Sequence, residues 1–170
     1  MNTTTCIRCQ NSYSSNAFRK LSKGECVWCQ WESPERRALA RFNDKVKLER
    51  VREARANERG DTFVPHLKVT KTQFLSWYLS QPDECHYCGL KLEQLRELQL
   101  RRGVFGYSVS WDIDRKDPKR FYERGNLALA CFMCNMAKGS YFDEDEAKVL
   151  GQAIRKVVKA RLKVVRESAP

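Results

Sequence analysis

The chain has 170 residues, with 32 basic and 21 acidic side chains and a formal net charge of +11 at pH 7. This length fits one compact domain or two small ones. No apolar run reaches the roughly 18 residues that a membrane span needs, and residues 1–5 lack the charged and apolar regions of a signal peptide. These features exclude an integral membrane protein, and we expect a cytoplasmic protein with no membrane partner.

The positive charge gives the first indication of a partner. If all eight cysteines bind metal as thiolates, they subtract eight charges and two Zn²⁺ ions add four, which leaves +7. A field of this sign favours a polyanion, and nucleic acid is the common one. The alternative on charge alone is a soluble basic protein without such a partner.

The cysteines form four Cys-x-x-Cys pairs with none left over: Cys6/Cys9, Cys26/Cys29, Cys85/Cys88 and Cys131/Cys134. Two such knuckles complete a tetrahedral site of four thiolates, and a disulfide framework is not expected in a reducing cytosol. The first two pairs are separated by 16 residues and the last two by 42. The spacing predicts one local zinc site and one that closes a longer loop, both structural, with crossed pairing of the knuckles as the alternative.

The first 33 residues form the predicted N-terminal zinc module, in which Phe18, Trp28 and Trp31 are expected to cover the metal. Ser33-Pro34-Glu35 then predicts the start of a helix that runs to about Arg59 and ends at Gly60. The predicted apolar stripe of this helix is Leu39, Phe42, Val46 and Val51. Its basic side chains either follow a phosphate backbone or form ion pairs on a solvated face: Arg36, Arg37, Arg41, Lys45 and Arg52.

Shorter elements follow in the second half. Thr70 predicts the cap of a helix over 71–80, and leucines at helical spacing predict another over 90–100. Val104 to Asp114 alternates as a strand with Tyr107, Val109, Trp111 and Ile113 on one face, and 126–131 predicts a second strand. A helix from Cys134 to Gly139 comes next, and the acids at 143–146 open a terminal helix. The apolar face of that terminal helix is Leu150, Ile154, Val157, Val158 and Leu162.

The order strand, loop, strand, helix is where we expect the chemistry. It places Asp114 at the end of a strand and Asn135 at the start of a helix, so that the two can face one another. A carboxylate and an amide oxygen suit Mg²⁺ or another hard divalent cation and leave positions for water and phosphate. Such an ion stabilises the transition state and the leaving oxygen of phosphodiester hydrolysis. Asp112 and Asp117 are nearby acids that can support the ligands.

The pattern Asp114-Arg115, Tyr122, Asn126, then Cys131-x-x-Cys134-Asn135-x-x-Lys138 resembles the HNH, or ββα-metal, endonucleases, above all their rare-cutting type II restriction members. The resemblance also covers both zinc modules, 70–78 and 149–154, and leaves 34–59 and 93–103 as extra length. It implies an α+β fold, in which a small ββα-metal motif is flanked by two four-cysteine zinc sites and helices. The units are then 1–33 (zinc module), 34–60 (charged helix), 61–142 (catalytic region with the second zinc site) and 143–170 (basic amphipathic helix).

The resemblance also implies residue roles. Asp114 and Asn135 hold the catalytic metal, Asn126 braces the loop between the strands, and Lys138 contacts phosphate or closes its helix. HNH enzymes usually place a histidine base after the metal-binding aspartate.

Here that position is Arg115, which cannot accept a proton at neutral pH and is expected to clamp the scissile phosphate. The resemblance assigns the activation of the nucleophile to Tyr78, with its pKa lowered by Arg115 and the metal. His66 would orient or deprotonate this tyrosine. Without the resemblance, the sequence predicts that Tyr78 is a core residue. Tyr107 and Tyr122 are the other candidates for activating the nucleophile.

The function expected from these features is a homodimeric restriction endonuclease that cuts double-stranded DNA at a palindrome. Its expected DNA contacts are Arg36, Arg37, Arg41 and Lys138. One alternative is another HNH nuclease of the homing, nicking or junction-cutting kind. A second is a zinc-ribbon DNA-binding protein without catalysis.

Overall fold

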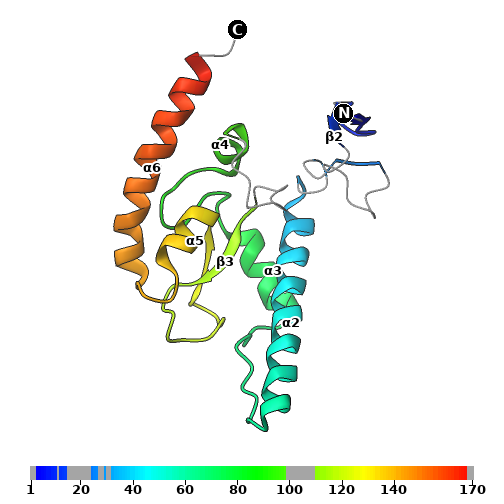
Figure 1. The fold of residues 1–170 in the computed structure, drawn as a ribbon, viewed down its shortest axis with the longest axis vertical. Coiled ribbons are helices and arrows are strands. Elements are labelled where there is room, and N and C mark those ends of the chain that lie inside the picture. The colour runs from blue at the N-terminus through cyan, green and yellow to red at the C-terminus, as the bar shows by residue number, and fades with distance from the viewer. Residues whose placement is uncertain are drawn as a thin grey trace.

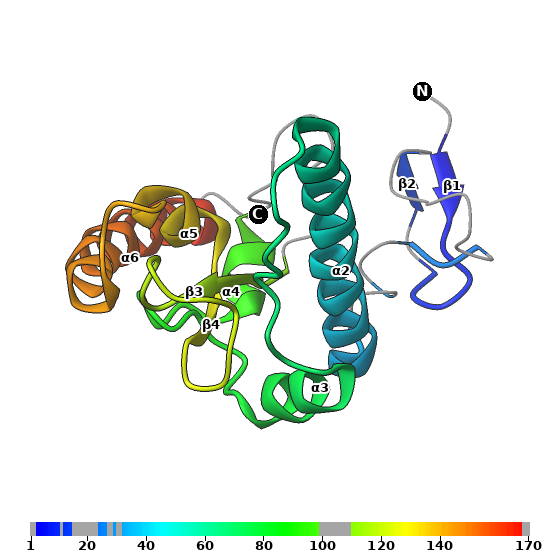
Figure 2. The same cartoon turned by 90° about the horizontal axis from the view of Figure 1, so that it is seen from below.

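In the computed structural model of the chain, the described residues are 3–10, 12–14, 24–26, 29, 32–98 and 110–167. Two antiparallel hairpins and five helices are found among them. In chain order they are β1 (Thr3–Thr5), β2 (Ser12–Ser14), α2 (Pro34–Arg59), α3 (Lys71–Ser80), α4 (Leu92–Glu97), β3 (Asp112–Arg115), β4 (Leu127–Ala130), α5 (Phe132–Lys138) and α6 (Glu144–Glu167). The β3–β4 hairpin lies between α5 and α6 on one side and α2 and α3 on the other (Figures 1 and 2). This is the α+β architecture that the sequence predicted.

The predicted helix starts are confirmed at α2 and α3. The Ser33 hydroxyl accepts a hydrogen bond from the backbone N–H of Arg36, and α2 ends at Gly60, whose φ of 71° is left-handed. Thr70 and Gln73 form a reciprocal capping box at the start of α3. Both starts follow from local side-chain chemistry, which is why the sequence alone located them.

The buried face of α2 differs from the predicted stripe. Leu39 and Val51 are 38% and 39% exposed, whereas Arg37 and Ala38 are buried. Ala38 belongs to the main core, and Phe42 packs against the Phe74 ring of α3 at 5.5 Å between centroids. The buried face of α2 therefore includes Ala38 and part of Phe42, rather than the larger aliphatic side chains of Leu39 and Val51.

The β3–β4 hairpin carries the expected catalytic aspartate. Asp112 pairs with Ala130 and Asp114 with Ala128 across the ladder. Side chains alternate along a strand, so Asp112 and Asp114 face α5 while Arg115 points to the opposite face. The strand predicted to start at Val104 begins at Asp112 among the described residues; 99–109, with Tyr107 and Val109, lie outside them, as do Phe18, Trp28 and Trp31.

Two helix boundaries differ from expectation. The helix predicted over 90–100 is limited to α4 within the described range. Helix α5 starts at Phe132, before the predicted Cys134, because the Cys131 sulfur accepts a hydrogen bond from the Cys134 N–H and caps the helix.

Helix α6 sits directly on the third cysteine knuckle. Val158 and Leu162 are buried as predicted, but Val157 is 52% exposed. A Cβ added at Gly151 would lie 2.4 Å from the Tyr87 carbonyl oxygen, so only glycine allows this approach. None of the described helices is long and apolar enough to cross a membrane.

Candidate active site

Both predicted four-cysteine clusters are assembled. Within each cluster the four sulfur atoms lie within 4.8 Å of one another: Cys6, Cys9, Cys26 and Cys29 in the first, Cys85, Cys88, Cys131 and Cys134 in the second. Sulfur–sulfur distances are 3.8 Å for Cys6–Cys29 and 3.9 Å for Cys88–Cys131. A tetrahedral Zn²⁺ with ordinary Zn–S bonds requires about 3.8 Å. The local pairing of knuckles is confirmed, and both clusters fit structural zinc.

The second cluster is bonded to the β3–β4 hairpin. The Cys85 sulfur accepts a hydrogen bond from the Cys131 N–H, and the His86 N–H donates to the Leu129 carbonyl at 2.8 Å. The knuckle at 85–88 is therefore held against strand β4, beside the aspartates of β3.

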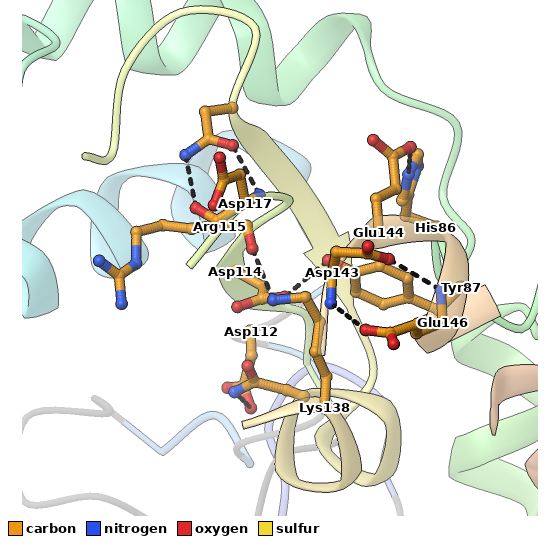
Figure 3. A network of polar contacts seen from close by, with 12 residues as sticks. His86, Tyr87, Asp112, Asp114, Arg115, Asp117, Lys138, Asp143, Glu144 and Glu146 are labelled. Atoms are coloured by element: carbon orange, nitrogen blue, oxygen red, sulfur yellow. Dashed lines mark hydrogen bonds and ion pairs between the residues drawn. The ribbon is translucent and has the colours of Figure 1, made fainter. Parts of the chain in front are cut away.

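Asp114 is 7% exposed and is held by two polar side chains. The Tyr87 hydroxyl donates to its Oδ2 at 2.6 Å, and the Lys138 ammonium lies 3.3 Å from the same oxygen (Figure 3). Burial, together with the nearby Asp114 carboxylate, raises the pKa of Tyr87, so the phenol stays protonated and donates. Within the described chain the other oxygen, Oδ1, takes part in no hydrogen bond or ion pair.

Asn135 meets Asp112 rather than Asp114. Its Nδ2 donates to Asp112 Oδ2 at 3.0 Å, and its Oδ1 has no hydrogen-bond partner among the described residues. These two side chains line a cavity of about 200 Å³ between α2 and β3. The remaining lining residues are Arg41, Asp44, Lys45, Leu48 and Ile113. The sequence predicted only a supporting role for Asp112.

The oxygen atoms of Asp114 and Asn135 suit a hard divalent cation. Asp114 and Asn135 lie on the facing elements β3 and α5, and each keeps one oxygen without a protein partner among the described residues. Carboxylate and amide oxygens are the ligands that Mg²⁺ and Ca²⁺ prefer, whereas the eight sulfurs are already grouped for zinc. In the chemistry of their donor atoms, Asp114 and Asn135 are therefore suited to the expected metal.

Two of the predicted DNA contacts are corrected by burial. The Lys138 ammonium is buried and donates to the Arg115 carbonyl at 2.8 Å, which ties the end of α5 to β3. Arg37 is 4% exposed, and its guanidinium pairs with Asp83 at 3.1 Å. Both cationic side chains are themselves buried, although the Asp83 partner of Arg37 is 55% exposed, so neither cation is presented at the surface for DNA.

The other two arginines are more accessible. Arg36 keeps 60% of its side chain exposed and pairs with Glu25. Arg41 is 17% exposed, pairs with Asp44 and has a nitrogen 3.8 Å from Asp112 at the cavity.

The environment of Tyr78 differs from the expected one. Its side chain is 3% exposed, and its ring centroid lies 6.2 Å from that of Phe74. Burial raises the pKa of Tyr78, opposed by the guanidinium groups of Arg37 and Arg41. The expected lowering by Arg115 is wrong, because α3 turns this tyrosine into the core and toward α2.

His66 has properties that suit a proton acceptor. Burial lowers its pKa, and the positive charges of Arg52 and Arg115 act in the same direction, so the ring is neutral at pH 7. Its Nδ1 is buried without a hydrogen-bond partner in the described structure. The His66 carbonyl accepts from the Tyr122 N–H, and the Arg115 guanidinium lies 5.3 Å from the centre of the Tyr122 ring. His66 and Arg115 therefore flank the same tyrosine.

Asn126 occupies the position of a loop brace. It is 1% exposed, and its Oδ1 accepts from the Asp117 N–H at 2.8 Å. Its Nδ2 donates to the carbonyl oxygens of Asp117 and Phe121. These three bonds hold the loop between β3 and β4, as the resemblance implied.

Comparisons with known proteins identify the family of the fold. No family model and no curated protein matches the sequence. Among solved structures, the chain is similar to the rare-cutting HNH restriction endonuclease PacI, with 30% sequence identity and a TM-score of 0.54. The match covers 93% of this chain and 97% of that one, so it extends over nearly the whole length of both. The chain belongs to the HNH endonuclease family.

Proposed function

We propose that the protein is a sequence-specific endonuclease of the type II restriction class that hydrolyses both strands of DNA with one divalent metal. The observation that carries the proposal is the pair of oxygens on Asp114 and Asn135 that have no protein partner in the described chain. It is supported by the similarity over nearly the whole length of PacI, itself a rare-cutting HNH restriction endonuclease.

In the proposed reaction Asp114 and Asn135 hold Mg²⁺ or another divalent cation. The bound ion would supply Lewis-acid stabilisation of the phosphoryl and leaving oxygens. Arg115 binds the scissile phosphate from the opposite face of β3, with a guanidinium suited to bidentate contact. A phosphodiester lying across the end of β3 would meet both groups.

We assign the proton acceptor to His66 in preference to Tyr78. A general base must be unprotonated near the working pH. His66 meets this condition because its pKa is lowered, whereas the buried Tyr78 has its pKa raised. Tyr78 remains the second candidate through the family resemblance, and the pH dependence of cleavage by His66→Ala and Tyr78→Phe separates the two assignments.

Double-strand cleavage at a palindrome is best explained by a homodimer, because each protomer then supplies one active site for one strand. The exposed Arg36 and the basic side chains of α6 are available for phosphate contacts: Arg155, Lys156, Lys159, Arg161 and Lys163. Such contacts orient DNA without reading its sequence.

The test is cleavage of a sequenced supercoiled plasmid by zinc-loaded protein and Mg²⁺, followed by mapping of the ends. We expect linear products with discrete ends. Asp114→Ala and Asn135→Ala should lose more than the roughly 100-fold in rate that removal of an outer-shell partner costs, while plasmid binding and zinc content persist. The Asp61 side chain is 56% exposed and, among the residues that the structure describes, forms an ion pair with Arg59 alone, so Asp61→Ala is the matched control and should cut as the wild type does.

The alternatives give different results. Nicked circles without linear product would indicate a nicking HNH enzyme. DNA binding with no Mg²⁺-dependent cutting by any variant would indicate a zinc-ribbon binding protein and would end the endonuclease proposal.

A further inference from the structure

We propose that Tyr87 is a positioning residue through which the second zinc cluster orients the metal-binding carboxylate of Asp114. The inference rests on the proposed role of Asp114 and extends it to a residue outside the ββα motif. Tyr87 lies inside the knuckle, between Cys85 and Cys88, and its hydroxyl meets a carboxylate 27 positions further along the chain.

The backbone of Tyr87 is held from several directions. Its neighbours Cys85 and Cys88 belong to the second cluster. The His86 N–H donates to β4, and the Gly89 N–H donates to the Cys85 carbonyl at 2.7 Å, which closes the turn. On the remaining side α6 contacts the Tyr87 carbonyl through Gly151. The zinc cluster, a strand and a helix thus determine where the Tyr87 ring points.

The ring transmits that position to Asp114. The ring is 4% exposed and so is enclosed by its neighbours, and the hydroxyl–carboxylate distance of 2.6 Å is that of a strong, charge-assisted bond. The adjoining Lys138 engages the same oxygen. With Oδ2 held by both donors, Oδ1 is the oxygen presented for a cation, and the carboxylate does not need to reorient on binding.

The contact resembles in kind the outer-shell partners that orient metal ligands, whose loss weakens metal affinity by about 10- to 100-fold. A tyrosine that only fills the core would act through its ring, and its removal would affect folding rather than metal affinity. The two roles are separated by deleting the hydroxyl alone.

The experiment is direct titration of zinc-loaded protein with Mn²⁺ in the absence of DNA, with free Mn²⁺ measured by electron paramagnetic resonance. We expect Tyr87→Phe to bind Mn²⁺ about 10- to 100-fold more weakly than the wild type, while it retains both zinc ions. Tyr141 is 89% exposed, so Tyr141→Phe is the control and should match the wild type. Wild-type Mn²⁺ affinity in Tyr87→Phe would overturn the inference. Loss of zinc or of the fold in Tyr87→Phe would overturn it equally, because the hydroxyl would then serve folding.

Asp114→Asn, titrated in parallel, keeps this inference distinct from the proposed function. If Asp114→Asn binds Mn²⁺ as the wild type does, Asp114 is not a ligand and both proposals fail. If Asp114→Asn loses Mn²⁺ while Tyr87→Phe does not, the metal site stands and only the role of Tyr87 falls.

Discussion

Lys138 is a buried cation whose partners are the Asp114 carboxylate and the Arg115 carbonyl. Replacing it with methionine leaves the carboxylate without its countercharge, and breaking such a buried pair costs about 3–5 kcal/mol. We therefore expect Lys138→Met to lower the free energy of unfolding by about this amount in urea denaturation with zinc present. Lys163, with 77% of its side chain exposed near Glu167, is the control, and Lys163→Met should be close to neutral. A loss below about 1 kcal/mol for Lys138→Met would contradict the buried pairing.

His66 gives a prediction for the pH dependence of cleavage. The folded protein holds the pKa of His66 below its ordinary value of 6.5. Its neutral, proton-accepting form is therefore the majority form above pH 6.5, and activity should fall as the pH drops through the lowered pKa. We expect the acid limb of kcat/KM to lie below pH 6.5. His66→Ala should remove that limb and cost about 10²- to 10⁴-fold in rate.

Tyr78→Phe is the companion variant. Removing the Tyr78 hydroxyl should leave the acid limb in place if His66 is the base. If instead Tyr78→Phe abolishes cleavage and His66→Ala keeps the acid limb, the general base is Tyr78 and not His66.

Single residues differ in how far the sequence revealed their role. The grouping of the cysteines was predictable because metal ligation imposes a spacing on its ligands. The resemblance to the family identified Asp114, Asn126 and Asn135, which lie on the expected hairpin and helix. Tyr87 was missed, since nothing in a Cys-x-x-Cys pair shows that one intervening side chain reaches a distant strand. The burial of Arg37 was missed for a related reason: its partner Asp83 is 46 residues away.

At the scale of elements, the contact between α6 and the third knuckle gives the clearest prediction. A methyl group at position 151 would overlap the Tyr87 carbonyl, and overpacking of this kind costs about 1–3 kcal/mol. We expect Gly151→Ala to lower the melting temperature, although alanine is the better helix former. Gln152 on the same helix is exposed, so Gln152→Ala should not lower it. An unchanged or raised melting temperature for Gly151→Ala would show that α6 can move away without cost.

Element boundaries and element faces were not equally predictable. The helix boundaries at Ser33, Gly60 and Thr70 depend on capping interactions between residues a few positions apart in the sequence. The face that α2 buries depends on α3, which is a separate element. The apolar stripe that includes Leu39 and Val51 does not show which side of α2 packs against α3.

At the scale of the whole molecule, the positive charge predicts how DNA binding depends on salt. Several neutralised phosphates give a log–log slope of several units, and loss of one phosphate contact reduces it by about one. We expect a steep decline of affinity between about 50 and 200 mM salt in fluorescence anisotropy. Arg36→Ala should give a slope lower by about one unit. A flat salt response in the wild type would remove the electrostatic argument for DNA as the partner.

The overall architecture was largely predictable because two metal clusters and one hairpin constrain it. Once the third and fourth knuckles share an ion, the segment between them must fold back, and β3 and β4 become neighbours. The placement of α2 and α6 on opposite sides of that hairpin was not predictable, since amphipathic helices show that they pack but not against what (Figure 1).

The long interval within the second cluster has a consequence for the order of synthesis. A ribosome makes the chain from the N-terminus, and Asp114 emerges before Cys131, Cys134 and Lys138. Until those residues leave the exit tunnel, the knuckle that carries Tyr87 has no second half and the aspartate lacks both of its anchors. A nascent chain that ends before residue 138 therefore lacks the Lys138 contact to Asp114 and has at most part of the fourth knuckle, so the Asp114 carboxylate is organised only once the following helix has been made.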